Sequence, residues 1–233
     1  MNKHKGGSSD KVYLINKLIL VLFLFAPVFT FAQPDWKEVA TVEEACRAWP
    51  EQIRTIFQHL DPGYHGLEDV RKAWEKNDLE KACTLLLKYY ENCPVAKKRA
   101  KGQPSPSGQK TDAAEQVLQN TFTFQQVTGQ VPLLDNGHLQ WDYEGPENDI
   151  EWAWALNRHY PMGTLLPEYF KTGNLRYAGY IDRFVKDWII RSRPYPGVKS
   201  STAMWRGLEV SFRVKMWAQL FYQLTGEAAL SPA

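Results

Sequence analysis

The chain has 233 residues, of which 44% are hydrophobic, 13% aromatic and 23% charged. This composition excludes a wholly disordered or fibrous chain, and the length predicts one domain, or one domain and a fragment of another. The net charge of +2 does not favour a strongly basic nucleic-acid binder, so no nucleic-acid partner is expected.

The first 32 residues are predicted to be a secretory signal peptide. Residues 1–17 carry four lysines, and residues 18–32 (LILVLFLFAPVFTFA) form an apolar run that is short for a membrane span and is interrupted by Pro27. Thr30 and Ala32 supply small side chains at positions −3 and −1, which predicts cleavage after Ala32 and a periplasmic or secreted protein. An uncleaved membrane anchor is the alternative. Cleavage would leave residues 33–233 with 24 basic and 25 acidic residues.

Export would permit disulfides, but the three cysteines, Cys46, Cys83 and Cys93, leave at least one unpaired within the chain. Their spacing is not that of a metal site, and the histidines form no metal-spaced set. Cys83 is predicted to be a buried small apolar residue, with a Cys83–Cys93 bridge as the alternative. Nucleotide-binding and metalloprotease motifs are absent from the sequence, so no cofactor is expected.

The segment that follows the leader is predicted to be helical. Thr41 and Glu44 have the spacing of a capping box at the start of an amphipathic run to about residue 60, interrupted at Pro50. Apolar residues at steps of three and four predict helices over 67–74 and 79–90, which form a helical hairpin. Such a hairpin suits a non-catalytic helical-repeat module, although the sequence shows no second unit at a 34-residue period.

Residues 94–112 are basic and rich in Pro, Gly and Ser, which predicts an exposed flexible loop or linker. Its cluster of Lys97, Lys98, Arg99 and Lys101 either contacts an acidic polymer or is simply solvated. A helix is predicted over 113–119, and short extended segments over 121–126 and 131–134. Helices follow over 150–160, 163–171, 177–191 and 203–225. The fold class is therefore all-α, an incomplete α/α toroid or barrel built of helix hairpins.

Two polar clusters on the late helices are candidate binding sites. In the first, Trp152, Leu156 and His159 share one face of a predicted helix, and Trp154, Asn157 and Arg158 share another. The purely structural interpretation is a core helix with a buried, hydrogen-bonded histidine.

Nine tryptophans, all beyond the leader, provide flat amphipathic faces of the kind that stack on sugar rings, although most of them are expected in the core.

The second cluster is Trp205, Arg206, Glu209 and Arg213. The spacing of three and four residues predicts an Arg206–Glu209–Arg213 ladder along one helical face. Such a ladder is either a structural ion-pair network or a rigid arginine held to grip a carboxylate or sulfate. A glycoside hydrolase would need two carboxylates across a cleft, for which Glu151 and Glu209 are the candidates.

An ordered series of motifs over about residues 140–225 resembles the N-terminal region of heparinase II/III-like polysaccharide lyases. The motifs are LNRH at 156–159, PMG at 161–163, TGN at 172–174 with Tyr177, DWI at 187–189, and WRGLE at 205–209 with Arg213. The resemblance implies an α/α toroid followed by a β-sandwich, which cleave uronic-acid-containing polysaccharides by β-elimination. An Asn, Arg or His neutralises the uronate carboxylate, a Tyr or His removes the C5 proton, and a Tyr protonates the leaving oxygen. No metal is obligatory for this chemistry.

In that family the catalytic Asn, Tyr, His and Arg lie on later elements, which would fall beyond Ala233. The chain alone is therefore expected to have little or no lyase activity, and its uncovered apolar helix faces are expected to cause self-association. The resemblance makes Trp152, Asn157, Arg158, His159, Trp205, Arg206, Glu209 and Arg213 substrate-binding or cleft-supporting residues. The implied partner is an acidic polysaccharide: heparan sulfate, heparin, chondroitin, hyaluronan and alginate all stay open. The alternative is an exported helical-repeat module that binds glycan or protein without catalysis.

Overall fold

The computed structural model of the protein describes residues 35, 37–61, 63–100 and 111–227. These residues belong to one unit of the chain, and they are mainly helical. The predicted signal peptide, residues 1–32, lies outside the described residues. Within the described ranges, no helix is both long enough and apolar enough to cross a membrane.

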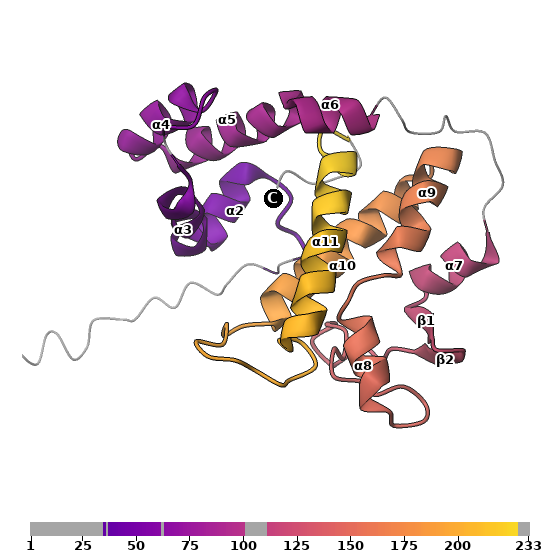
Figure 1. Ribbon diagram of the computed structural model, residues 1–233. Coiled ribbons are helices and arrows are strands. Elements are labelled where there is room, and N and C mark those ends of the chain that lie inside the picture. Colours follow the sequence, from indigo (N-terminus) through magenta and orange to yellow (C-terminus); the bar gives the residue numbers. More distant parts are fainter. Residues whose placement is uncertain (1–34, 36, 62, 101–110, 228–233) are drawn as a thin grey trace, which may run out of the picture. The chain divides into compact units, whose positions relative to one another are not determined.

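Helices make up most of the described chain (Figure 1). Their order, with one pair of strands, is α2 Val42–Ala48, α3 Pro50–His59, α4 Glu68–Glu75, α5 Leu79–Asn92, α6 Pro94–Ala100, α7 Asp112–Leu118, β1 Thr121–Phe124, β2 Val127–Gln130, α8 Ile150–Leu156, α9 Met162–Thr172, α10 Leu175–Arg191 and α11 Gly207–Leu224.

The first helices begin where the sequence signals predict. Glu44 N donates to Thr41 Oγ1 at 3.1 Å, and Thr41 N donates to Glu44 Oε2 at 3.0 Å, which completes the capping box of α2. Pro50 occupies the first turn of α3, where its missing N–H removes no helical hydrogen bond. The predicted helical hairpin is α4 with α5, and the Asp78 side chain caps α5 by accepting from Lys81 N at 3.1 Å.

A small apolar cluster joins α3, α4 and α5. Its buried members are Phe57, Leu67, Val70, Ala73 and Ala82. The rings of Phe57 and Trp74 stack with their centroids 5.1 Å apart. The periodic apolar faces predicted from the sequence therefore meet in one common core.

The predicted loop over 94–112 is partly wrong, because its first seven residues form helix α6. Pro94 stands at the helix start, where it is tolerated, and the alanines, lysines and arginine that follow favour a helix. Helix α6 packs against α11. Lys97 is exposed on α6, and residues 101–110 lie outside the described part of the chain.

Strands β1 and β2 form an antiparallel hairpin in which Phe122 pairs with Gly129 and Phe124 with Val127. The second strand begins four residues earlier than the segment predicted over 131–134. The tight turn consists of Gln125 and Gln126, which have φ angles of 49° and 70°. Two successive positive φ angles define a type I′ turn, normally marked by Asn and Gly, so the sequence carried no clear signal for it.

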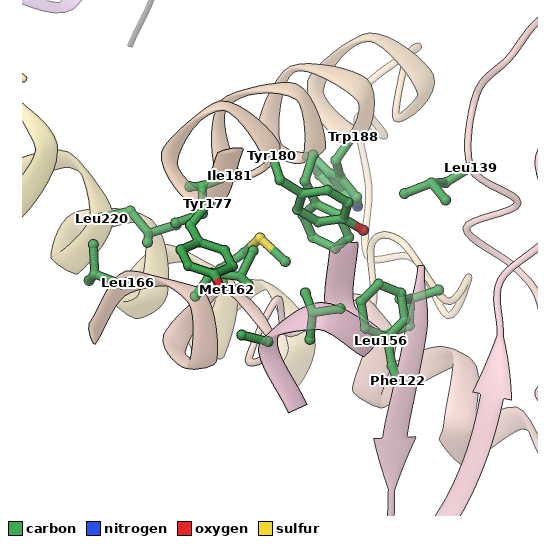
Figure 2. Packing of buried hydrophobic residues seen from close by; sticks show 14 of the residues in the cluster. Phe122, Leu139, Leu156, Met162, Leu166, Tyr177, Tyr180, Ile181, Trp188 and Leu220 are labelled. Atoms are coloured by element: carbon green, nitrogen blue, oxygen red, sulfur yellow. The ribbon is translucent and has the colours of Figure 1, made fainter. Parts of the chain in front are cut away.

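The main core lies between this hairpin and helices α8 to α11 (Figure 2). Its fully buried side chains include Phe122, Leu156, Met162 and Tyr177. Aromatic rings meet edge to face, as in the pair Trp141 and Phe184, whose centroids are 4.8 Å apart. The aromatic side chains that could have served as sugar platforms are thus mainly structural.

Two ends of the late helices differ from the prediction by four residues, and both differences shape the candidate site. Helix α8 ends at Leu156 instead of residue 160, and α11 begins at Gly207 instead of residue 203. Arg158, His159, Trp205 and Arg206 therefore lie in the segments that flank these helices. The predicted single helical face of Trp152, Leu156 and His159 is wrong for the same reason, although all three side chains are buried.

Candidate functional site

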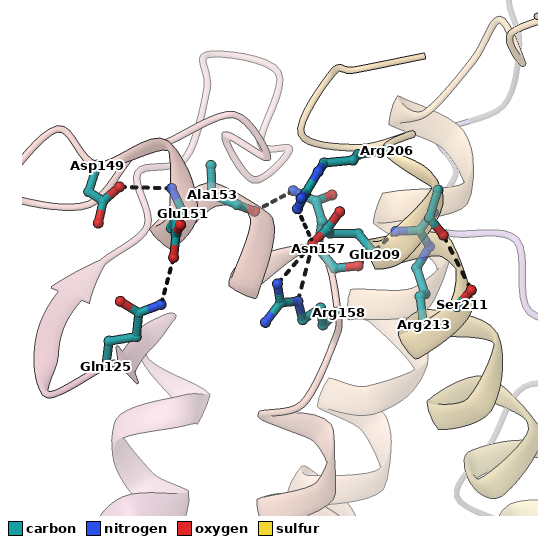
Figure 3. A network of polar contacts seen from close by, with 11 residues as sticks. Gln125, Asp149, Glu151, Ala153, Asn157, Arg158, Arg206, Glu209, Ser211 and Arg213 are labelled. Carbon is teal, nitrogen blue, oxygen red and sulfur yellow. Dashed lines mark hydrogen bonds and ion pairs between the residues drawn. The ribbon is translucent and has the colours of Figure 1, made fainter. Parts of the chain in front are cut away.

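A buried carboxylate connects the two predicted polar clusters (Figure 3). Glu209, in the first turn of α11, is 0% exposed. Its Oε1 accepts from Arg158 Nη2 at 2.9 Å, from Arg158 Nε at 3.3 Å and from Arg206 Nη1 at 2.9 Å. Arg158 and Glu209 are 51 residues apart in the sequence, so the fold brings the two motifs together.

Aromatic rings hold the two arginines in place. The Arg206 guanidinium lies 3.9 Å from the centroid of the Trp154 ring, and the Arg158 guanidinium lies 5.3 Å from that of Phe212. The side chains of Arg158 and Arg206 remain 24% and 33% exposed. A guanidinium has five N–H donors in a planar fork, so each arginine keeps donors for an anionic ligand while it binds Glu209.

The predicted three-residue ladder is only half correct. Arg206 pairs with Glu209 as expected, but the second ion-pair partner of Glu209 is Arg158. Arg213 instead donates to the carbonyl oxygens of Asn157 at 2.7 Å and Met204 at 2.9 Å.

Arg213 is a structural residue in this arrangement. It is 2% exposed, and its guanidinium lies 3.8 Å from the centroid of the Trp188 ring. Burial lowers the pKa of Arg213 to about 10, against the opposing effect of the Glu209 charge. Arg213 therefore stays charged at neutral pH and ties the segment after α8 to the segment before α11.

Asn157 is buried and fully engaged in hydrogen bonds. Its Nδ2 donates to the carbonyl oxygens of Trp141 at 2.8 Å and Ala153 at 2.9 Å, and its Oδ1 accepts from Trp188 Nε1 at 2.8 Å. With 0% exposure it fixes the end of α8 and has no surface to offer a ligand.

His159 is also enclosed by the core. Its Nδ1 accepts from Trp217 Nε1 at 2.9 Å, and its ring stacks on Trp141 with centroids 5.3 Å apart. Burial, and then the nearby charge of Arg213, lower the pKa of His159 well below its usual value. The side chain is therefore neutral at pH 7, and its complete burial makes it a support for the site.

The two remaining predicted residues, Trp152 and Trp205, are supports as well. Trp152 Nε1 donates to Val127 O at 3.2 Å, which attaches α8 to the β-hairpin. Trp205 Nε1 donates to Ser192 O at 2.8 Å, and its ring lies edge-on to Trp188. The Trp205 bond fixes the segment that carries Arg206.

A surface cavity of about 390 Å³ reaches Arg158. The cavity is lined by Arg158, by polar side chains that include Gln116, Thr121 and Gln125, and by aromatic residues that include Phe122 and Tyr160. A positive charge beside amide and hydroxyl groups suits an anionic, hydroxyl-rich ligand. The cavity was not predicted, because β1, α7 and the segment after α8 are distant in sequence.

The paired-carboxylate hypothesis finds little support in this geometry. Glu151 is exposed and accepts from Gln125 Nε2 at 3.0 Å, whereas Glu209 is buried between two arginines. With 0% exposure, the Glu209 carboxyl group offers no surface to a substrate, as a catalytic acid or base would need to. Within the described ranges, no three His, Cys, Asp or Glu side chains gather as metal ligands.

Sequence reasoning missed a second buried polar group, formed by His138 and Asp187. His138 Nδ1 contacts Asp187 Oδ1, while Asp187 Oδ2 accepts from Leu139 N at 3.0 Å and Trp141 Nε1 at 2.8 Å. This carboxylate anchors the segment after β2 to α10. The residues are more than 45 positions apart in sequence, so no local spacing could have indicated the contact.

Comparison with known proteins places this chain in a family. The family model described as the heparinase II/III N-terminus matches residues 56–233. The heparin-sulfate lyase of Pedobacter heparinus is 27% identical over 189 residues, and that of Bacteroides thetaiotaomicron is 22% identical over 191 residues. These alignments cover 77% and 76% of this chain, but only 28% and 26% of the two lyases.

The fold agrees with the sequence match. A crystal structure of the heparan sulfate lyase from Pedobacter heparinus superimposes with a TM-score of 0.59 at 27% identity, covering 77% of this chain and 29% of that one. The chain therefore belongs to the heparinase II/III N-terminus family. It spans little more than a quarter of the length of the lyases that it matches.

Proposed function

We propose that this chain is the N-terminal part of an exported polysaccharide lyase, and that it binds a uronic-acid-containing polysaccharide through Arg158 and Arg206. In this proposal the described helices form the first part of an α/α toroid. The main support for the proposal is the pair of partly exposed arginines fixed on one buried glutamate, with Arg158 lining a cavity of mixed polar and apolar side chains.

The arrangement suits anion recognition more than catalysis. Glu209 and the stacked rings of Trp154 and Phe212 hold both guanidinium groups before a ligand arrives, which reduces the conformational entropy lost on binding. A guanidinium binds a carboxylate or sulfate with two parallel hydrogen bonds. The negative charge of Glu209 is shared by two cations, so the cluster keeps a net positive charge toward a ligand.

The chemistry proposed for the complete protein is β-elimination. Neutralising the uronate carboxylate makes the C5 proton more acidic, a base removes that proton, and an acid protonates the leaving glycosidic oxygen. The candidate residues that are most enclosed, Asn157 and His159, are bound within the core, so neither is assigned as the base. The chain alone is therefore expected to bind without cleaving.

The test is a binding titration of the 233-residue chain with a heparan sulfate oligosaccharide. Replacing a guanidinium that makes a charge-assisted contact removes about 1.5–3 kcal/mol, so Arg158→Gln and Arg206→Gln should each weaken binding by roughly 10-fold or more. Arg47→Gln is the matched control, because Arg47 forms an exposed ion pair on α2. Equal affinity of all three variants would refute the assignment.

Activity is checked separately, by following the absorbance of unsaturated uronate ends. No growth of this absorbance is expected with the chain alone. A non-catalytic module that binds protein instead of glycan would show no oligosaccharide binding in the titration, which separates the alternative from the proposal.

A further inference from the structure

Two cysteines from different helices lie in contact at the start of the described chain. Cys46 is in α2 and Cys83 is in α5, and their Sγ atoms are 3.9 Å apart. Both side chains are partly buried, and both are thiols in this structure. A disulfide has an S–S bond of about 2.05 Å, so these sulfurs need to approach by roughly 2 Å to bond.

Well-defined helix ends place the two sulfurs. The capping box of Thr41 and Glu44 fixes the start of α2 at Val42, four residues before Cys46. The side-chain cap of Asp78 fixes the start of α5. Helices α2 and α5 pack against each other, and Cys83 lies against the apolar cluster beside the fully buried Ala82. The contact therefore comes from packed helices, not from a loop.

The third cysteine, Cys93, lies too far from Cys83 to form a disulfide with it. Cys93 caps the C-terminal end of α5, ten residues after Cys83, which corresponds to about 15 Å along a helix axis. Disulfides require Cα atoms within about 7 Å. The Cys93 Sγ instead accepts from Ala96 N at 3.5 Å, at the start of α6. A Cys83–Cys93 bridge, the alternative considered from the sequence, is thus excluded by the helix that separates them.

We propose that Cys46 and Cys83 form a structural disulfide when the chain meets a disulfide oxidant. One cysteine thiolate attacks the oxidant's sulfur, forming a mixed disulfide and releasing one thiol of the oxidant. The other cysteine thiolate then attacks the bonded cysteine sulfur and releases the second thiol. Two cysteine thiols lose two protons and two electrons, and the oxidant disulfide becomes two thiols.

The environment of the sulfurs makes this bond slow to form and durable. Burial raises the pKa of both thiols, and that of Cys83 to about 12, so the reactive thiolate is scarce at neutral pH. Exchange should accelerate as the pH rises. Once formed, the bond closes a loop over a separation of 37 residues, which restricts the unfolded chain and stabilises the folded one.

The experiment uses the reduced full chain and oxidised glutathione as the oxidant at mildly alkaline pH. After acid quenching, free thiols are alkylated and counted by mass spectrometry. The expected result is one alkylated cysteine, Cys93, in place of three, with one cross-linked peptide joining Cys46 to Cys83. The apparent unfolding temperature should rise by roughly 5–10 °C on oxidation.

Two variants serve as controls. Cys93→Ser should still form the bridge and leave no free thiol. Cys46→Ser should keep two free thiols and show no temperature shift after oxidation. Three free thiols in the treated wild-type chain, a persistent glutathione adduct on Cys46 or Cys83, or a bridge that includes Cys93 would overturn the proposal. None of these readouts depends on glycan binding.

Discussion

Removing the charge of Glu209 is the sharpest test of the arginine cluster. In the Glu209→Gln variant the side chain keeps its size but loses the charge that binds Arg158 and Arg206 through three hydrogen bonds of 2.9–3.3 Å. Hydrogen bonds to charged groups contribute about 1.5–3 kcal/mol each. Because both arginines are partly exposed and can turn toward water, the combined loss is smaller than that sum.

A further contribution comes from Arg213, which is buried and loses a compensating negative charge. We therefore expect Glu209→Gln to lower the free energy of unfolding by about 2–3 kcal/mol. With an m-value of about 2 kcal/mol per molar urea, the midpoint of unfolding should fall by roughly 1 M. Tryptophan fluorescence reports the transition, since Trp154, Trp188 and Trp205 lie around the cluster.

The matched control is Glu151→Gln, which removes an exposed carboxylate and should leave the midpoint unchanged. A Glu209→Gln variant with the midpoint of the wild-type chain would refute the claim that this carboxylate organises the site. A loss equal to that of Glu151→Gln would do the same.

Three further predictions follow from other contacts. Because His159 is neutral and buried in the folded protein, its imidazole binds a proton more readily in the unfolded chain. The free energy of unfolding should therefore fall as the pH drops below about 6.5. In urea titrations the His159→Gln variant should lose that part of the pH dependence, whereas the control variant His65→Gln, at an exposed position, should retain it. The Gly145→Ala variant should have a free energy of unfolding about 2 kcal/mol lower in the same assay. Gly145 has a φ of 76°, and an added Cβ would lie 2.7 Å from Trp152 Cγ. An unchanged urea midpoint would contradict this packing. The apolar groove between α3 and α10 should cause the chain to self-associate, as measured by size-exclusion chromatography with light scattering. The Ile56→Lys variant, which places a charge in the groove, should self-associate less. A strictly monomeric wild-type chain at high concentration would count against this prediction.

Local sequence signals were sufficient for most of the helices. The capping box at Thr41 and the periodic apolar residues of α5 act within one or two turns, so they can be recognised without the fold. The short spacing of Arg206 and Glu209 also identified a true ion pair. The family resemblance rested on motifs in the same region, and the family match over residues 56–233 confirms it.

Tertiary contacts decided the features that the sequence did not reveal. Helix α8 ends early where Asn157 bonds to Trp141 and Trp188, and His159 then takes a φ of 63° that a helix does not allow. Arg158 was expected beside Asn157 on a helix, yet its partner is Glu209, 51 residues away. Such contacts depend on packing between distant segments, which local spacing does not encode.

The most direct test of the proposed function compares two ligands on the same protein. The 233-residue chain is titrated with a heparan sulfate oligosaccharide and with the same oligosaccharide after its uronate carboxyl groups have been reduced to alcohols. If Arg158 and Arg206 recognise uronate, reduction should weaken binding by roughly 10-fold or more, and Arg158→Gln should lose most of its ability to distinguish the two ligands. Equal affinity of the wild-type chain for both ligands would contradict the recognition of uronate by Arg158 and Arg206.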